Sequence, residues 1–252
     1  MLPLLEGHGS LLDICRGASV DGIIGVLAAG RGLDVTIVSP SRNHANSLKR
    51  FASELGVEAE SINFVLGSLD KLTQLNLGKF DCVTALHVLE HADSPRVALE
   101  SLRERTISQC IVAVPTCLNP TAWVRLGGSD PYTYGAGSWK ALFRGFLKVL
   151  RAGLSGRISV VELVSEFGTE TVHPWYLPKR LIHELEWSGF HIEEVRPDTL
   201  LLPWSQRLLP LARKLQGLRT LGPVATWGFG THFVLRPLWR DESVLVQRRA
   251  SE

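Results

Sequence analysis

The sequence lacks several features that mark whole classes of protein. It contains no stretch approaching the roughly 18–20 consecutive apolar residues that a membrane-spanning helix needs. Its first ten residues, MLPLLEGHGS, lack the basic start and long apolar run of a secretory signal peptide. It has no internal repeat and no low-complexity segment. These absences favour a globular protein of the cytoplasm over a membrane-spanning, secreted or fibrous one.

Cysteine and net charge are also scarce. The four cysteines, Cys15, Cys82, Cys110 and Cys117, have neither CxxC nor any other paired ligand spacing, and three lie in apolar, strand-like runs. We therefore expect a reducing compartment. A net charge of +2 argues against a nucleic-acid partner. The 252 residues are 45% hydrophobic and suffice for one α/β domain with an elaboration, or for two small domains.

Strand-like and helix-like segments alternate through the first half of the chain. Strands are predicted at residues 10–15, 34–38, 62–66, 80–86 and 109–115, and helices at 20–29, 43–55 and 95–105. Such alternation predicts right-handed crossovers and a parallel sheet, with ligands bound beyond the carboxyl ends of the strands. The second half is less regular, with a helix predicted at 178–188 and strands at 190–196 and 230–236.

Three phrases carry a family resemblance. Leu11–Ser19 reads LLDICRGAS; FDCVTALHVLEHADSPRVALESLR begins at Phe80 and is followed by IVAVPT; TVHPWYLPKRLIHELEWSGFHIEEV begins at Thr171. They resemble the first loop, the fourth and fifth strands with the helix between them, and the segment entering the sixth strand of small-molecule class I S-adenosylmethionine-dependent methyltransferases. The resemblance implies an α/β fold: a doubly wound, mainly parallel, seven-stranded Rossmann-like sheet with its last strand antiparallel and an inserted helical cap.

The domain organisation follows from this fold. Residues 1–116 are predicted to form the cofactor-binding half, and 117–176 an inserted cap over the substrate. Residues 177–240 would complete the sheet, with a second cap excursion at 198–226. Residues 241–252 form a charged tail.

The resemblance also implies the cofactor, S-adenosylmethionine, and the residues around it. The predicted cofactor-binding residues are Asp13, Cys15, Gly17, Ser19, Ser39, Ser68, Leu69 and Leu86. The family pattern has glycine where Cys15 and Ser19 stand, and carboxylates where Ser39 and Ser68 stand. A hydrogen bond to a charged group contributes about 1.5–3 kcal/mol, against about 0.5–1.5 kcal/mol for a neutral one. Binding is therefore expected to be weakened rather than abolished.

Histidines supply the candidates for acid–base chemistry, because imidazole titrates near neutral pH. His87 follows the fourth predicted strand directly, His91 begins the next helical segment, and His173 enters a later helix. For His91 a fold-stabilising role is the stronger alternative. His87, Glu90 and His91, with His173, also resemble a metal-binding phrase of some O-methyltransferases, but no metal is predicted because the same phrase occurs in metal-free relatives.

Two segments have an amphipathic helical pattern. In Ser138–Ala152, one face carries Trp139, Leu142, Phe143, Phe146, Leu147 and Leu150, and the other carries Lys140, Arg144, Lys148 and Arg151. Trp204–Leu218 is similar but is interrupted by Pro210. Two interpretations stay open: peripheral contact with an anionic membrane, or a pair of cap helices packed over the crevice with a solvated basic face.

The leading functional hypothesis is methyl transfer from S-adenosylmethionine to the oxygen or carbon of a small or lipid-like, fairly apolar acceptor. The alternative is a catalytically silent methyltransferase-like protein that acts as a partner subunit or membrane-surface adaptor. Either would be cytoplasmic, with membrane association if the amphipathic segments serve a bilayer.

Overall fold

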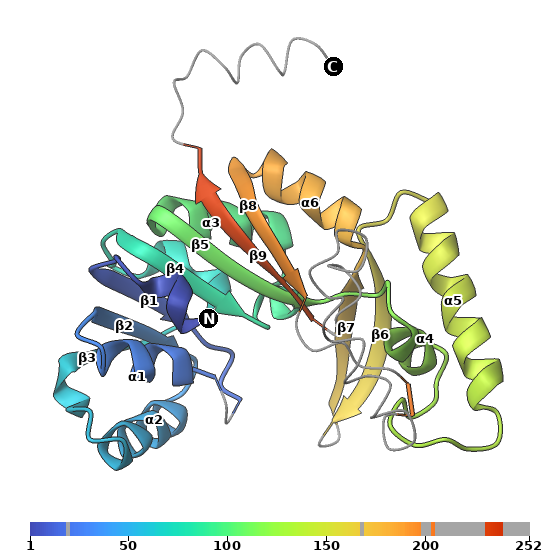
Figure 1. The fold of residues 1–252 in the computed structure, drawn as a ribbon, viewed down its shortest axis with the longest axis horizontal. Helices are drawn as coiled ribbons and strands as arrows, with labels where there is room; N and C mark the ends of the chain where they lie inside the picture. Colours follow the sequence, from blue (N-terminus) through green and yellow to red (C-terminus); the bar gives the residue numbers. More distant parts are fainter. Residues whose placement is uncertain (19–20, 167–168, 198–202, 205–229, 239–252) are drawn as a thin grey trace, which may run out of the picture.

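A seven-stranded sheet forms the centre of the molecule (Figure 1). The computed structural model describes residues 1–18, 21–166, 169–197, 203–204 and 230–238. The strands of the sheet are β1 (Ser10–Ile14), β2 (Asp34–Ser39), β3 (Ile62–Leu66), β4 (Phe80–Leu86), β5 (Thr106–Pro115), β8 (Phe190–Pro197) and β9 (Gly230–Pro237). Their order is β3-β2-β1-β4-β5-β9-β8, and only β9 runs antiparallel to its neighbours. The predicted mainly parallel sheet with an antiparallel last strand is confirmed.

Helices cover both faces of this sheet, as the near-continuous apolar strands require. On one face, α1 (Ile23–Ala29) and α2 (Arg42–Glu54) contribute Val26 and Leu48 to a core with Leu11, Val35 and Ile37 of the strands. On the other face, α3 (Pro95–Arg105) and α6 (Pro178–Trp187) contribute to a core that includes Leu12, Ile14, Leu99, Leu102 and Leu185. The sheet is therefore doubly wound.

Most predicted boundaries hold to within a few residues. The predicted limits of β3, β4 and α3 coincide with the observed ones, and Ser94 caps α3 by accepting from the Val97 N–H ahead of Pro95. The helix predicted from Val20 instead begins at Ile23, because Gly22 adopts a left-handed backbone (φ 80°) and forms the N-cap. Strand β5 begins at Thr106, three residues before the predicted start.

Residues 117–176 form a separate layer beside the sheet (Figure 1). This layer contains α4 (Pro120–Leu126), α5 (Ser138–Leu154) and an antiparallel hairpin of β6 (Ser159–Glu166) and β7 (Thr169–Tyr176). Its own core includes Cys117, Leu126, Val149, Val160 and Trp175. The region expected to form a helical cap thus consists of α4, α5 and a β-hairpin. The predicted excursion 198–226 lies outside the described residues except for Pro203 and Trp204, and the tail 241–252 lies wholly outside them.

Helix α5 packs through small residues rather than through its large apolar ones. Its buried positions are Ser138, Ala141, Gly145, Val149 and Ala152. A Cβ atom at Gly145 would lie 1.8 Å from the Trp123 carbonyl oxygen, and one at Gly127 would lie 1.8 Å from that of Ala141. The Trp139–Leu150 face of α5 is largely exposed, although Phe146 meets the Trp123 ring and Trp139 the Trp204 ring. No helix among the described residues is long and apolar enough to cross a bilayer.

Substitution of Gly145 tests the contact between α4 and α5. We expect Gly145→Ala to lower the free energy of unfolding by about 2–4 kcal/mol, because the new methyl group meets rigid backbone. Gly153→Ala, in the same helix with open space around it, should raise stability by about 0.5–1 kcal/mol. Urea denaturation of both variants gives the comparison. Equal effects of the two substitutions would contradict the packing described.

Candidate active site

The loop after β1 departs from the strand at Cys15, whose N–H still donates to the Val38 carbonyl (2.9 Å). The Cys15 side chain is 1% exposed and belongs to the core beneath α1 and α2. Its Sγ lies only 3.2 Å from where a Cβ of Gly22 would stand. Burial raises the pKa of this thiol far above its usual range. Cys15 therefore points into the core and can offer the crevice only backbone.

Gly17 is the loop residue whose backbone requires glycine. It has a φ of 97°, and a Cβ there would approach Pro40 Cγ to 2.8 Å. The loop consequently crosses close above the end of β2, where larger residues do not fit. Ser19, the other predicted member of the loop, lies outside the described residues.

Asp21 holds the loop through its carboxylate. The N–H groups of Arg16 and Ala18 both donate to Asp21 Oδ2 (3.2 and 3.0 Å), and the Arg16 guanidinium lies 3.8 Å from the same oxygen. The Asp21 carboxylate therefore accepts the hydrogen bonds of these two loop N–H groups.

Asp13 lies underneath this loop and joins three elements. Its Oδ1 accepts from the Thr84 hydroxyl of β4 (2.6 Å), and its Oδ2 accepts from the Gly25 N–H of α1 (3.0 Å). Burial raises the pKa of this carboxyl to about 6. The two hydrogen bonds oppose this shift, and the neighbouring Asp21 adds to it. Both carboxylate oxygens are engaged within the protein, so the structure places Asp13 in a supporting position.

Ser39 ends β2 and is fully buried. Its hydroxyl donates to the Ser41 carbonyl (3.0 Å) and lies 2.8 Å from His44 Nδ1 in the first turn of α2. His44 Nε2 is buried and has no hydrogen-bond partner among the described residues. At the place where the family pattern has a carboxylate, this chain has a hydrogen-bonded Ser39–His44 pair.

The segment after β3 begins with Gly67 and Ser68. Ser68 is half-buried and its hydroxyl makes no cap hydrogen bond to the short 3-10 helix Leu69–Gln74. The Leu69 side chain is buried in the main core, so only its backbone remains available. Asp70 Oδ1 accepts from the Asp93 N–H (3.0 Å) and thereby ties this segment to the start of α3.

His87 leaves β4 directly after Leu86 in a constrained conformation. Its φ is 55°, uncommon for a residue with a side chain, and its N–H donates to the Ala113 carbonyl of β5 (2.8 Å). Such strained positions concentrate at functional sites. The side chain is 35% exposed, and its Nδ1 lies 3.4 Å from the buried Glu90 Oε1. Glu90 therefore orients the imidazole from below.

His91 and His173 meet edge to face, with ring centroids 4.6 Å apart. Arg16 from the β1 loop approaches His91, with its Nη1 2.9 Å from Nε2. Because arginine only donates, this nitrogen accepts and the proton lies on Nδ1. Burial, His173 and Arg16 lower the pKa of His91, although Glu90 raises it. His91 is thus a neutral, engaged side chain that links the loop to β7.

The structure brings His87, Glu90, His91 and His173 together but assembles no metal centre from them. Among the residues that the structure describes, no three histidine, cysteine or carboxylate side chains are placed to hold an ion. The lone pair of His91 Nε2, which a metal ion would need, already accepts a hydrogen bond from the Arg16 guanidinium.

The hairpin has an exposed apolar face. Val161 and Leu163 alternate with the buried Val160 along β6, and Val172 pairs with Leu163 across the hairpin. All three side chains are exposed, on the face opposite Val160. His173 follows Val172 in β7 and pairs with Glu162, so its side chain lies on the opposite face of the hairpin, the face of Val160.

Sequence reasoning missed Arg16, Asp21 and His44 as members of the site. An aspartate ahead of Gly22 at a helix start could have been identified as a loop clamp. The positions of Arg16 and His44 depend on contacts between distant elements, which no local pattern reveals.

S-adenosylmethionine bound at these strand ends would meet backbone and hydroxyl groups rather than carboxylates. The Gly17 loop keeps the left-handed turn that lets the chain cross close above the end of β2, and Ser68 offers a hydroxyl. At the end of β2 the Ser39–His44 pair stands where a carboxylate would hold the ribose. The fit therefore relies on shape and on neutral hydrogen bonds.

Residues 15–112 match the family model described as a methyltransferase domain. They span the sheet from the end of β1 into β5, together with the crevice just described. S-adenosylmethionine is the cofactor typical of this domain family. No curated protein matches the chain.

Solved structures with the same fold include several methyltransferases. A putative S-adenosylmethionine-dependent methyltransferase from Listeria monocytogenes is 14% identical, with 91% of each chain covered and a TM-score of 0.57. The CcbJ methyltransferase from Streptomyces caelestis is 15% identical (94% of this chain, 86% of that one, TM-score 0.54). The [4+2]-cyclase SpnF is 16% identical (93% and 76%, TM-score 0.53). The fold is that of class I methyltransferases.

The raised pKa of Asp13 makes a prediction about stability. The folded state binds the Asp13 proton more tightly than the unfolded chain does, so the protonated carboxyl stabilises the fold. This stabilisation is complete at low pH and is lost as pH rises through about 6. The loss is on the order of 3 kcal/mol. An asparagine amide in its place would carry no charge, could accept from Gly25 and could donate to Thr84. Asp13→Asn should therefore remove the decline, as urea titrations at pH 4.5 and 7.5 would show.

Asp81→Asn is the matched control. Asp81 accepts from the backbone of Gly9 and Ser10, and these bonds hold its pKa below its usual value. Its contribution is present at neutral pH and is lost in acid, so Asp81→Asn should act in the opposite direction. An unchanged pH dependence in Asp13→Asn would contradict the role assigned to Asp13.

Proposed function

Starting from the methyltransferase domain in residues 15–112, we propose that the protein transfers a methyl group from S-adenosylmethionine to a small or lipid-like, fairly apolar acceptor. The observation that carries this proposal is His87, held at φ 55° at the carboxyl end of β4 and backed by the buried Glu90. This arrangement presents a titratable group at the edge of the sheet where ligands of such folds bind.

The cofactor would lie across the carboxyl ends of β1, β3 and β4. Gly17 and Leu86 would border it with backbone, and Ser68 would contribute a hydroxyl. Asp13 supports the loop from below rather than touching the ligand. When bound, S-adenosylmethionine supplies an electrophilic methyl group. The protein's part is to hold an acceptor atom in line with that group.

His87 would act as the general base for a hydroxyl acceptor. Its imidazole takes the proton of the hydroxyl as the oxygen lone pair forms the new bond to carbon. Glu90, 3.4 Å from His87 Nδ1, stabilises the resulting imidazolium. His91 is less suited to this role, because its Nε2 faces Arg16 and its pKa is lowered. His173, which meets His91 edge to face, would help to position the acceptor.

A second candidate function is favoured by the loop and by the end of β2. The N–H groups of Arg16 and Ala18 are already bound to Asp21, and Ser39 is buried against His44. These contacts suit a methyltransferase-like protein that serves as a partner or adaptor without transferring a methyl group. One similar structure, SpnF, is described as a [4+2]-cyclase, so likeness in fold does not by itself fix the reaction.

Cofactor binding is tested by calorimetry with S-adenosylhomocysteine. We expect binding, and a roughly 3–10-fold weaker affinity for Ser68→Ala, because one neutral hydrogen bond contributes about 0.5–1.5 kcal/mol. Ser61→Ala, an exposed serine at the other end of β3, should bind like the wild type. No binding at millimolar ligand would support the silent alternative and remove the proposed reaction.

The base is tested with His87→Asn, since asparagine tolerates a left-handed backbone. We expect transfer of labelled methyl groups to a panel of apolar phenols and carboxylic acids to fall about 10²–10⁴-fold for hydroxyl acceptors. S-adenosylhomocysteine affinity should stay within about twofold, since a base for the acceptor contributes no bond to the cofactor. Glu90→Gln should reduce kcat in the pH range where the rate depends on the base, without abolishing activity. His191→Asn, on the exposed side of β8, is the control; equal losses in it and in His87→Asn would contradict the assignment.

A further inference from the structure

One side of α5 exposes a row of large apolar side chains. The row consists of Trp139, Phe143, Phe146, Leu150 and Leu154, spaced three or four residues apart. Trp139 and Phe143 are 61% and 60% exposed, and Leu154 is 80% exposed. The helix is anchored to α4 by its small residues. Within the row, Phe146 meets the Trp123 ring and Trp139 meets the Trp204 ring, while Phe143, Leu150 and Leu154 are exposed. An apolar row left at the surface marks an interaction site.

Cations accompany this row without any compensating acid. Residues 131–161 contain Lys140, Arg144, Lys148, Arg151 and Arg157 and no aspartate or glutamate. The first four lie on α5, in the sector between the apolar row and the buried small residues. A helix with aromatic and leucine residues on one side and lysine and arginine beside them is typical of a membrane-interface helix.

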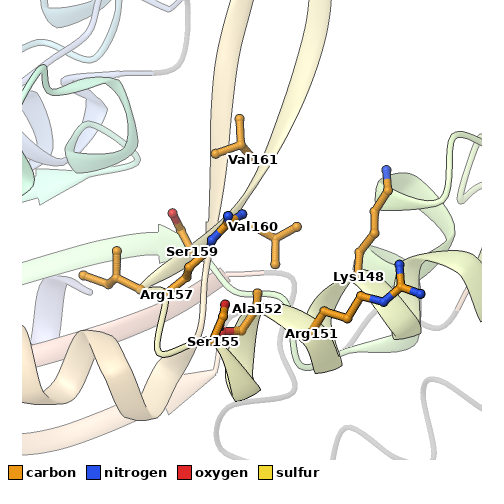
Figure 2. Close-up of a pocket in the computed structure, with 9 residues that line it drawn as sticks. Lys148, Arg151, Ala152, Ser155, Arg157, Ser159, Val160 and Val161 are labelled. Carbon is orange, nitrogen blue, oxygen red and sulfur yellow. The ribbon is translucent and has the colours of Figure 1, made fainter.

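An open, basic pocket lies where this helix ends (Figure 2). It has a volume of about 850 Å³ and is lined by Lys148, Arg151 and Arg157 together with the hydroxyls of Ser155 and Ser159. No carboxylate lines it. Lys148 Nζ also donates to the Leu126 carbonyl (2.6 Å), which fixes one of the cations in place. Leu150 and Leu154 directly precede Arg151 and Ser155, so the apolar row borders the pocket.

We propose that α5 and this pocket form a docking surface for a bilayer that contains anionic phospholipid. The apolar row inserts at the boundary between headgroups and acyl chains, and the cations of α5 and the pocket contact lipid phosphates. The surface lies at the outer end of the molecule, with α4 and the hairpin on its inner side (Figure 1). At 17 residues, α5 is roughly 25 Å long, which is enough to lie along a flat membrane.

Charge favours a bilayer over a second copy of this chain. In a two-fold dimer through α5 the same patch faces itself, so the row of cations would face an identical row with no acid between them. A surface of anionic headgroups complements both the cations and the apolar row. The docking does not depend on methyl transfer and would stand if the proposed reaction failed.

Co-sedimentation of the full chain with vesicles tests the docking surface. We expect binding to phosphatidylcholine vesicles that contain about one-third phosphatidylglycerol, and at least tenfold weaker binding to pure phosphatidylcholine. Raising NaCl to about 1 M, where the Debye length is about 3 Å, should release most of the protein. Failure to pellet with anionic vesicles at low salt would overturn the proposal.

Matched variants separate the two parts of the surface. Phe143→Ser with Leu150→Ser removes exposed apolar groups, and Arg151→Gln with Arg157→Gln removes pocket charge; each pair should weaken anionic-vesicle binding about tenfold or more. Arg42→Gln with Arg50→Gln removes the same charge from exposed sites on α2 and should have little effect. Equal losses in this control would overturn the proposal. Calorimetric binding of inorganic phosphate without vesicle binding would also overturn it, in favour of a soluble phosphate ligand.

Discussion

The buried carboxyl of Asp13 is the contact on which the candidate site depends. Its two oxygens join β4, through Thr84, to the first turn of α1, through Gly25, directly beneath the loop that follows β1. An ionised carboxylate in this position is costly, which is why burial raises its pKa to about 6. The two hydrogen bonds to this carboxyl join β1, β4 and α1 at one point.

With Asp13 occupied below, the loop above it is organised by charged side chains of its own segment. Asp21 binds the loop N–H groups, and Arg16 extends from the loop to His91, which in turn meets His173 of the hairpin. The crevice and the hairpin layer are thus connected through one arginine and two histidines. This connection leaves His87, oriented by Glu90, as the titratable side chain best placed for chemistry on an acceptor.

The fold could be predicted from the sequence wherever a local pattern determines it. Buried strands such as Ile62–Leu66 can be predicted from their hydrophobic pattern alone. The start of α3 at Ser94–Pro95 can be predicted from its capping residues. The hairpin β6–β7 was missed because its strands pair mainly with each other and its outer face is apolar rather than alternating. Helix α5 was identified, but its packing face was not, because small residues at Ala141 and Gly145 carry no strong hydrophobic signal. The His87–Glu90 and His91–His173 contacts lie at predicted residues, whereas Arg16 and His44 required the tertiary structure.

The central claim is that the carboxyl ends of β1, β3 and β4 bind S-adenosylmethionine through the Gly17 loop. Hydrogen–deuterium exchange of the full chain, with and without S-adenosylhomocysteine, tests this most directly. The account predicts slower exchange in residues 14–18, 67–70 and 86–88, and no change in α5. Unchanged exchange in these three segments at saturating ligand, or protection confined to other parts of the chain, would contradict it.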